Sequence, residues 1–119
     1  MGILKVREEP GEVVVVGCEP GTALDAANSG ELRERAGELL GRSSNLVFDM
    51  GGVTFLDSSA IGALVGLMRA ARESGGDVRL ARVGRDVRTI FELTRLDSVF
   101  GIYPSVAEAV RSFTESPGR

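Results

Sequence analysis

Two adjacent hydroxyls beside a carboxylate are the side chains of this sequence best placed to do chemistry. Asp57, Ser58 and Ser59 follow the apolar pair Phe55-Leu56 and precede a long segment of helical periodicity. A carboxylate or hydroxyl at such a point caps a helix, because it accepts hydrogen bonds from the free N–H groups of the first turn. An exposed serine there can also carry a phosphate, whose charge of about −2 suits the positive helix end but repels acidic neighbours. These residues therefore fit both a structural cap and a modification site.

The absence of histidine removes most catalytic alternatives. The chain has 119 residues and 0 His. Ser-His-Asp and Cys-His nucleophiles, histidine phosphotransfer and His-containing zinc sites each need an imidazole as base, acceptor or ligand. Ser58 has only Asp57 beside it as a base, so we do not expect it to be a catalytic nucleophile. We predict a protein that is not an enzyme, with no catalytic residue, no metal site and no cofactor of its own.

Composition and charge exclude further classes of protein. Hydrophobic residues make up 43% and charged residues 26% of the chain, as in globular domains. The formal net charge is −3 and no basic cluster interleaves with aromatic residues, so we expect no nucleic-acid binding. No apolar run approaches the roughly 20 residues of a membrane-spanning helix, and no leader is visible. With one cysteine, Cys18, and hence no internal disulfide, the sequence predicts a cytoplasmic protein with no membrane association.

The segments that must position these side chains alternate between strands and helices. The sequence predicts an opening strand pair that turns at Pro10 and Gly11, and a turn-rich stretch at 19–22. Hydrophobic periodicity predicts strands near 3–6, 13–16, 46–49, 78–83 and 100–103, and helices near 32–40, 58–74, 87–93 and 106–113. Gly41 is expected to close the first helix, and Ser105 with Glu108 to form a capping box on the last. We predict one α/β domain over 1–119, a mixed, mostly parallel sheet of about five strands with about four helices, and a frayed tail at 115–119.

The segment around Ser58 carries a recognisable signature. Residues 49–62 read Asp-Met-Gly-Gly-Val-Thr-Phe-Leu-Asp-Ser-Ser-Ala-Ile-Gly, and further motifs follow at 75–80, at 87–97 with Phe100, and at 108–109. From about residue 44 to residue 113 the chain resembles the STAS-domain anti-sigma factor antagonists. The resemblance is specific, because several motifs occur in the right order at the right spacing. The order of the preceding elements fits the same STAS-like domain.

The resemblance implies a bacterial partner-switching protein. In that family the serine directly after the aspartate, here Ser58, is phosphorylated by an anti-sigma factor that is also a serine kinase. The unphosphorylated form binds this kinase and frees a sigma factor, and the phosphorylated form dissociates until a metal-dependent serine phosphatase resets it. ATP and metal then belong to the partners. The partner-binding residues implied by the resemblance and by the helix end are Asp25, Asp57, Ser58, Ser59, Ile61 and Gly62.

The chain departs from the family pattern at two places. Family members usually carry Gly-Glu-Leu/Ile-Asp after the second strand, whereas residues 22–25 here read Thr-Ala-Leu-Asp, which retains Asp25. That loop is expected to lie near Ser58 and to contribute to the partner surface. Ala60 stands where glycine is commoner, and alanine suits a first helical turn.

Two alternatives to the phosphorylated antagonist stay open at this stage, and a third is excluded. A STAS scaffold or sensor module could bind a partner or a small ligand without being phosphorylated. Asp25, Asp49 and Asp57 could gather around Mg²⁺, which favours carboxylate oxygens, although helix caps and strand-end carboxylates are commoner. A response-regulator receiver, with Glu8-Glu9 as the acidic pair and Asp49 as acceptor, fails, because the one lysine is Lys5, in the first strand, whereas the receiver family needs one at the end of its last strand.

Overall fold

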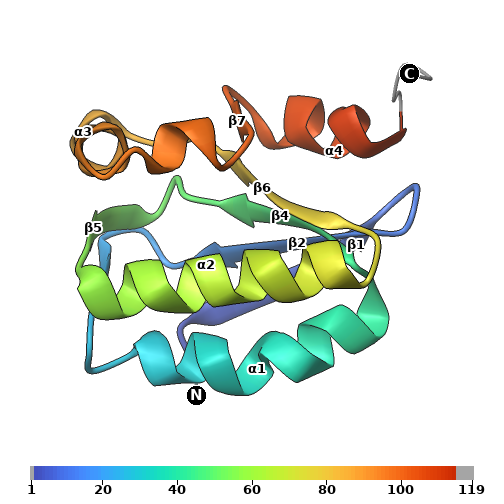
Figure 1. Cartoon of the computed structure of the whole chain (residues 1–119), viewed down its shortest axis with the longest axis horizontal. Helices are drawn as coiled ribbons and strands as arrows, with labels where there is room; N and C mark the ends of the chain where they lie inside the picture. The colour runs from blue at the N-terminus through green and yellow to red at the C-terminus, as the bar shows by residue number, and fades with distance from the viewer. Residues whose placement is uncertain (1, 115–119) are drawn as a thin grey trace.

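The central sheet has five strands, and all but the first run in parallel. In the computed structural model, which describes residues 2–114, β1 (Leu4–Glu9) pairs antiparallel with β2 (Val13–Cys18). The parallel strands β4 (Asn45–Asp49), β6 (Asp77–Ala81) and β7 (Ile102–Tyr103) extend the sheet in the order β1-β2-β4-β6-β7. The predicted α/β fold, a mixed and mostly parallel sheet with a hairpin at one edge, is confirmed (Figure 1).

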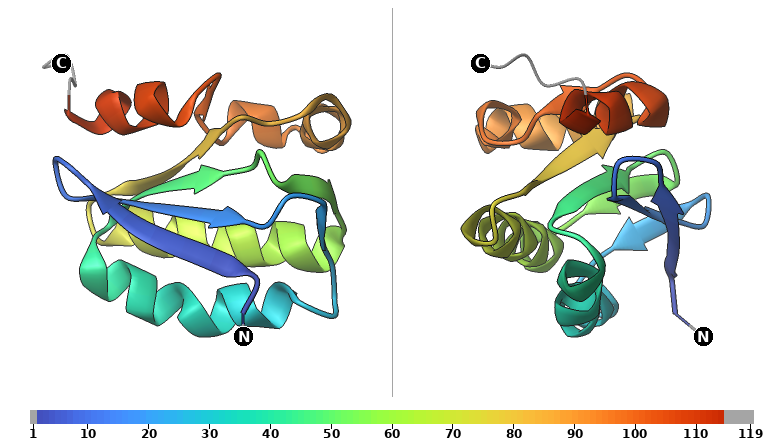
Figure 2. Two further views of the ribbon diagram at one scale, coloured as in Figure 1. Left: turned by 180° about the vertical axis from the view of Figure 1, so that it is seen from behind. Right: turned by 90° about the vertical axis from the view of Figure 1, so that its right-hand side faces the viewer.

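Helices cover both faces of this sheet. The helices of the described chain are α1 (Ser29–Arg42), α2 (Ser58–Glu73), α3 (Arg85–Leu93) and α4 (Val106–Thr114), with a short 3-10 helix at Leu96–Ser98. The helices α1 and α2 lie side by side on one face of the sheet, and α3 and α4 lie on the opposite side (Figures 1 and 2). α4 packs on the main sheet, whereas α3 packs against β5 (Val53–Leu56) and the 3-10 helix. Within residues 2–114, none of these helices is long and apolar enough to cross a membrane.

The run of valines in β2 supplies the core on both faces of the sheet. Successive side chains of a strand point to opposite faces, so a strand buried on both faces has an uninterrupted apolar run. Val14 and Val16 pack into the larger core with α1 and α2, whereas Val13 and Val15 pack into a smaller core with Ala109 of α4. All four valines are exposed by 2% or less. The sheet is therefore a fixed platform for the loops at its ends.

Two further strands are present that the periodicity did not predict. β3 (Thr22–Leu24) and β5 (Val53–Leu56) pair in parallel as a separate two-stranded sheet. The turn-rich stretch predicted at 19–22 is present as a turn at residues 20–21, but it leads into β3, which was not predicted, before the first helix. Segments this short give no visible alternation, and what holds them is their mutual pairing, aided by the Thr22 N–H donating to the Gly52 carbonyl at 2.8 Å.

Several predicted boundaries are displaced. Gly41 does not close α1, which ends one residue later at Arg42. Val83 and Phe100 lie outside the strands assigned to them, and Phe100 packs on Phe91 with ring centroids 6.0 Å apart. The predicted tail at 115–119 lies outside the described residues.

The local signals for turns and caps are confirmed. Gly11 has a φ of 85°, which is the left-handed value that the third position of the predicted type II turn requires. The Ser105 hydroxyl oxygen accepts a hydrogen bond from the Glu108 N–H at 3.1 Å, and the hydroxyl donates to the Glu108 carboxylate at 3.1 Å. The predicted cap therefore starts α4 at Val106.

Glu31 of α1 binds the beginning of the first strand. One of its carboxylate oxygens accepts a hydrogen bond from the Ile3 N–H at 2.8 Å and the other accepts one from the Leu4 N–H at 3.2 Å. These amides lie at the start of β1, which is an edge strand of the sheet. Glu31 thus supplies the acceptors that a neighbouring strand would otherwise provide.

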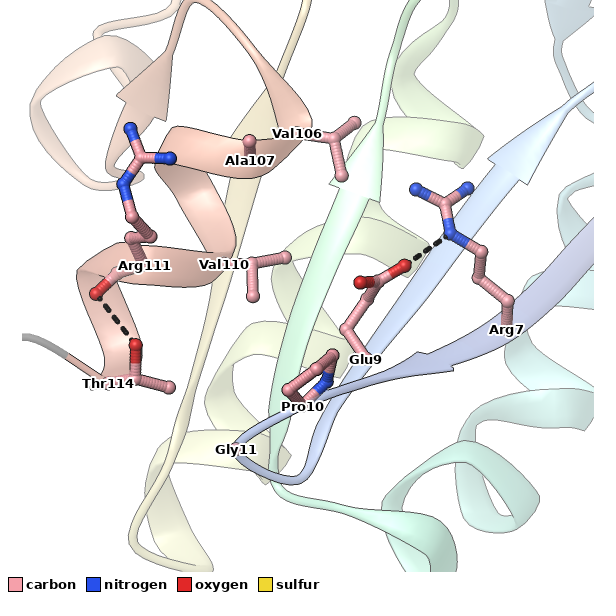
Figure 3. A pocket seen from close by; sticks show the side chains of 9 residues that line it. All are labelled: Arg7, Glu9, Pro10, Gly11, Val106, Ala107, Val110, Arg111 and Thr114. Atoms are coloured by element: carbon pink, nitrogen blue, oxygen red, sulfur yellow. Dashed lines mark hydrogen bonds and ion pairs between the residues drawn. The ribbon is translucent and has the colours of Figure 1, made fainter.

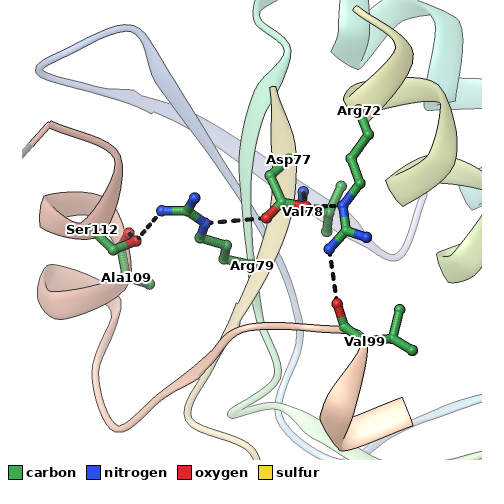
Figure 4. A network of polar contacts seen from close by, with 7 residues as sticks. All are labelled: Arg72, Asp77, Val78, Arg79, Val99, Ala109 and Ser112. Carbon is green, nitrogen blue, oxygen red and sulfur yellow. Dashed lines mark hydrogen bonds and ion pairs between the residues drawn. The ribbon is translucent and has the colours of Figure 1, made fainter. Parts of the chain in front are cut away.

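Asp77 organises a polar network between α2, β6 and α4. Its carboxylate, 18% exposed, accepts hydrogen bonds from Arg72 Nε at 2.8 Å and from Arg79 Nε at 3.3 Å. Arg72 also donates to the Val99 carbonyl at 2.8 Å, and Arg79 donates to the Ser112 hydroxyl at 2.8 Å (Figure 4). One carboxylate therefore orients two arginines that connect elements on both faces of the sheet.

Replacing Asp77 by alanine is expected to lower the free energy of unfolding by about 1 kcal/mol, because the half-buried Arg79 and the exposed Arg72 lose their shared acceptor. Urea denaturation followed by circular dichroism measures this change. Glu34→Ala removes an exposed carboxylate of α1 and should change the stability by less than about 0.5 kcal/mol. Equal losses in the two variants would contradict the structural role of Asp77.

Candidate functional site

The start of α2 is fixed by the carboxylate of Asp57. One carboxylate oxygen accepts a hydrogen bond from the Ala60 N–H at 3.0 Å, which is the predicted N-cap. The other oxygen accepts one from the Ala26 N–H, also at 3.0 Å, in the loop between β3 and α1. This second hydrogen bond was not predicted. Through it, one side chain joins the beginnings of two helices that are far apart in the sequence.

Asp25 shapes the loop that Asp57 holds. The Asp25 carboxylate accepts a hydrogen bond from the Ala27 N–H at 3.0 Å, and the Asp25 N–H donates to the Asn28 side-chain oxygen at 2.9 Å. The Asp57 N–H donates to the Leu24 carbonyl at 3.1 Å, directly before this loop. The expectation that this loop lies beside the start of α2 is therefore correct. Asp25 itself is half-buried and turned toward its own loop.

The exposed face of the first turns of α2 is formed by Ser58 and Gly62. Both are exposed, and residues four apart share one face of a helix. Ser59 is half-buried, and Ile61 is half-buried against the main core rather than turned to solvent. The predicted partner-binding residues thus gather at one end of the molecule, with Ser58 and Gly62 outermost and Ile61 on the inner side.

Arg33 of α1 reaches across to this same turn. Its Nη2 donates a hydrogen bond to the Ser59 carbonyl at 3.1 Å. The same nitrogen lies 3.3 Å from the position that a Cβ on Gly62 would occupy, so the guanidinium rests on the surface that the glycine leaves open. The sequence reasoning missed Arg33, because nothing local to residue 33 indicates that α1 packs beside α2 with both helices starting at the same end.

Asp49 does not join the other two aspartates. Its carboxylate accepts hydrogen bonds from Arg82 Nη1 at 3.1 Å and from the Gly51 N–H at 2.9 Å. Between residues 2 and 114, no three His, Cys, Asp or Glu side chains gather as a metal site. The arrangement of three carboxylates considered for Mg²⁺ is therefore not formed, since each aspartate is bound to its own loop or to an arginine.

Cys18 lies half-buried at the end of β2, against the turn that follows β4. Burial raises the pKa of its thiol to about 11, and the carboxylates of Glu31 and Asp49 act in the same direction. Gly52 approaches so closely that a Cβ there would overlap the Cys18 carbonyl oxygen, so the glycine does more than form a turn. A protonated, half-buried thiol is a packing group rather than a nucleophile.

A groove of about 540 Å³ lies between α4 and the hairpin of β1 and β2. Val106 and Val110 of α4 face the hairpin, and Arg7 and Glu9 rise from β1 on the other side, joined by an ion pair of 2.7 Å (Figure 3). The hairpin tip and the start of α2 are at opposite ends of the molecule (Figure 1). The groove is therefore separate from the residues around Ser58.

Comparisons with known proteins agree on one family. The model of the STAS domain matches residues 5–109. A Thermotoga maritima protein is 30% identical over 74 residues, which make up 61% of this chain and 66% of that protein. The anti-sigma-B factor antagonist of Bacillus subtilis is 24% identical over 79 residues, which make up 66% of this chain and 72% of the relative.

Solved structures show the same fold. A Thermotoga maritima crystal structure superposes with a TM-score of 0.82 at 21% identity, covering 93% of this chain and 94% of that chain. The unphosphorylated anti-sigma factor antagonist SpoIIAA gives a TM-score of 0.71 at 17% identity, covering 96% of this chain and 99% of that one. The structure of the phosphorylated form of the Bacillus SpoIIAA gives a TM-score of 0.70 at 20% identity, covering 91% of this chain and 96% of that one. At these sequence identities the similarity to the solved structures shows that the fold is shared.

Asp57→Ala is expected to lower the free energy of unfolding by about 1–2 kcal/mol, because two backbone N–H groups lose their acceptor. Asp57→Asn should lose less stability than Asp57→Ala. Its side-chain carbonyl oxygen can still accept the hydrogen bond that caps α2, while its amide nitrogen cannot accept one from the Ala26 N–H. Chemical denaturation measures both changes. Asp86→Ala, an exposed carboxylate in the first turn of α3, is the matched control and should cost no more than about 0.5 kcal/mol. A loss in Asp57→Ala no greater than in this control would contradict the bridging role.

The Cys18 thiol is expected to be alkylated slowly. Its pKa is raised from 9.0 to about 11, so at pH 8 its thiolate fraction should be about a hundredfold below that of a small reference thiol. Iodoacetamide labelling followed by mass spectrometry measures the rate, and labelling as fast as the reference would refute the expectation.

The same shift predicts a pH dependence of stability. Because the folded-state pKa is raised, the unfolded thiol ionises first, so stability present below pH 9 should fall as the pH rises toward 11. Comparison with Cys18→Ala, which lacks this ionisation, isolates the effect from other groups that titrate in the same range.

Proposed function

The chain belongs to the STAS domain family, and from that membership we propose that it acts as an anti-sigma factor antagonist switched by phosphorylation of Ser58. The observation that carries the proposal is the exposed Ser58 hydroxyl, directly after the capping carboxylate of Asp57 at the start of α2. A relative from Bacillus subtilis is an anti-sigma-B factor antagonist, and SpoIIAA is known in an unphosphorylated and a phosphorylated form. Both relatives support the proposal that this chain, too, is an anti-sigma factor antagonist.

Ser58 is a substrate in this proposal and not a catalyst. A kinase partner transfers the γ-phosphoryl group of ATP to the Ser58 oxygen, ADP leaves, and the hydroxyl proton passes to a base of the kinase. Asp57 has a structural part, because its two carboxylate oxygens accept hydrogen bonds from the N–H groups of Ala60 and Ala26. Its part is to hold the backbone of the first turn, so that the hydroxyl is presented in one position. The chain itself is a regulator without enzymatic activity and needs no cofactor.

The unmodified end of α2 is the surface that binds the kinase anti-sigma factor. It comprises the loop of Asp25 and the exposed positions Ser58 and Gly62, with Asp57 and Ser59 between them. Binding there releases a sigma factor from the kinase, and the chain works in the cytoplasm. A phosphate on Ser58 adds about −2 charges at the positive end of α2, which tolerates them, while an acidic partner surface is repelled. A serine phosphatase removes the group and restores binding.

Incubation with a cognate kinase anti-sigma factor and ATP is expected to add one phosphate to the parent protein and to Ser59→Ala, and none to Ser58→Ala. Intact-mass and peptide mass spectrometry measure the uptake. Ser59 is the matched control, because it is the neighbouring hydroxyl and is half-buried. Ser58→Asp should bind the unmodified kinase at least tenfold more weakly than the parent, with an unchanged melting temperature, since an acid is tolerated at a helix N-terminus.

Equal uptake of phosphate by Ser58→Ala and the parent would refute Ser58 as the switch. No uptake by the parent, together with unchanged binding of Ser58→Asp, would instead favour a STAS module that recognises its partner without being phosphorylated.

A further inference from the structure

We propose that Arg33 binds the phosphate on Ser58, so that the chain carries its own phosphate-binding residue beside the modification site. The inference rests on the proposed phosphorylation of Ser58 and adds to it how the modified state is held. It is drawn from the contacts of the Arg33 guanidinium at the junction of α1 and α2. Neither the cap of α2 nor the packing of the core requires an arginine at this position.

The position of the guanidinium brings it close to the Ser58 side chain. Arg33 Nη2 lies 3.3 Å from the position of a Cβ on Gly62. Cβ atoms four residues apart on a helix are about 5–6 Å from each other, and each points toward the helix N-terminus. From Gly62 that direction leads to Ser58. A phosphate on the Ser58 oxygen therefore extends into the space beside the guanidinium, and a small rotation of the long arginine side chain brings the two into contact.

The charges around the site leave Arg33 available for this contact. Its partner in the unmodified protein is a neutral acceptor, the Ser59 carbonyl. The neighbouring arginines of α1 are differently bound, since Arg35 pairs with Glu38 at 3.0 Å and Arg42 with Glu8 at 2.8 Å. In the ion pairs formed within residues 2–114, Arg33 takes no part.

A phosphate is a better partner for Arg33 than the carbonyl it binds now. Hydrogen bonds between a guanidinium and a phosphate are charge-assisted, often bidentate, and roughly twice as strong as those to neutral acceptors. The nearby carboxylate of Asp57, whose oxygens accept hydrogen bonds from backbone amides, repels a phosphate on Ser58 electrostatically. Arg33 offsets that repulsion.

The contact also changes the surface that a partner would meet. With the guanidinium drawn to the phosphate, the exposed strip between Ser58 and Gly62 is covered by a paired side chain and phosphate. Phosphorylation then acts in two ways, by adding negative charge and by covering the face on which the kinase binds.

The test uses full-length protein with phosphoserine encoded at position 58, so that no kinase is needed. A titration followed by ³¹P NMR gives the midpoint pH of the second ionisation of the phosphate. A nearby cation favours the dianion, so Arg33→Gln is expected to raise this midpoint by about half a pH unit relative to the parent. Arg33→Lys, which keeps the charge but not the bidentate geometry, should lie between the two.

Arg69→Gln is the matched control. It removes the same charge from an exposed position of α2, 11 residues from Ser58 and hence about 16 Å along the helix, where screening is strong. Its midpoint should equal that of the parent. Equal shifts in Arg33→Gln and Arg69→Gln, or no shift in either, would overturn the proposal. Circular dichroism establishes that each variant is folded. If Arg33→Gln is not, Arg33→Met, which also removes the charge, takes its place, and a midpoint equal to the parent value overturns the proposal.

The two proposals can fail separately. If a kinase does not phosphorylate Ser58, the switch is refuted, while the titration of the encoded phosphoserine still reports whether Arg33 binds phosphate. If the titration shows no dependence on Arg33 but the kinase modifies Ser58, the switch stands and the role of Arg33 is refuted.

Discussion

The two oxygens of one carboxylate decide where the candidate site lies. Asp57 accepts hydrogen bonds from Ala60 in its own helix and from Ala26 in a loop 31 residues earlier. The Ala60 N–H is buried and would cost about 1–3 kcal/mol without an acceptor, whereas Ala26 is exposed and its N–H gains less from the same carboxylate. The Asp57 carboxylate therefore holds the loop of Asp25 beside the start of α2, together with the hydrogen bond from the Asp57 N–H to the Leu24 carbonyl. A partner protein that contacts both the loop of Asp25 and the start of α2 therefore binds them in one fixed relative position.

The larger architecture serves this arrangement indirectly. The central strands β2 and β4 are buried on both faces and form the platform, but they do not carry the site themselves. The smaller sheet of β3 and β5 does, because β3 leads into the loop held by Asp57 and β5 leads into Asp57 and α2. Leu24 and Leu56 are paired across this small sheet and both are buried. Two short strands thus transmit the rigidity of the core to the loops above it.

Features fixed by neighbouring residues could be predicted from the sequence, and those fixed by distant partners could not. The valine run of β2, the periodicity of α2 and the caps at Asp57 and Ser105 depend on residues within a few positions of one another, and these predictions are confirmed. The existence of β3 and β5 depends on a pairing between segments some 30 residues apart. Such strands are too short to be recognised one at a time.

The same division holds within the candidate site. Asp57 and Ser58 are found from a local motif, and the proximity of the Asp25 loop from a family resemblance. The hydrogen bond from Arg33 to the Ser59 carbonyl joins residues 26 apart, and no pattern around either residue indicates it. It requires knowing that α1 and α2 lie side by side and begin at the same end of the sheet.

Glu31 has a consequence for how the molecule can associate with others. The free edge of a β-sheet is a template on which another chain can add a strand, and such growth leads to aggregates. Here the first amides of β1 are already bound by Glu31, and β1 continues with charged side chains at Lys5, Arg7, Glu8 and Glu9. At the other edge β7 spans only Ile102–Tyr103, too short to pair firmly with a strand. Neither edge therefore favours growth of the sheet by the addition of a strand from another copy of the chain, so the fold itself opposes polymerisation.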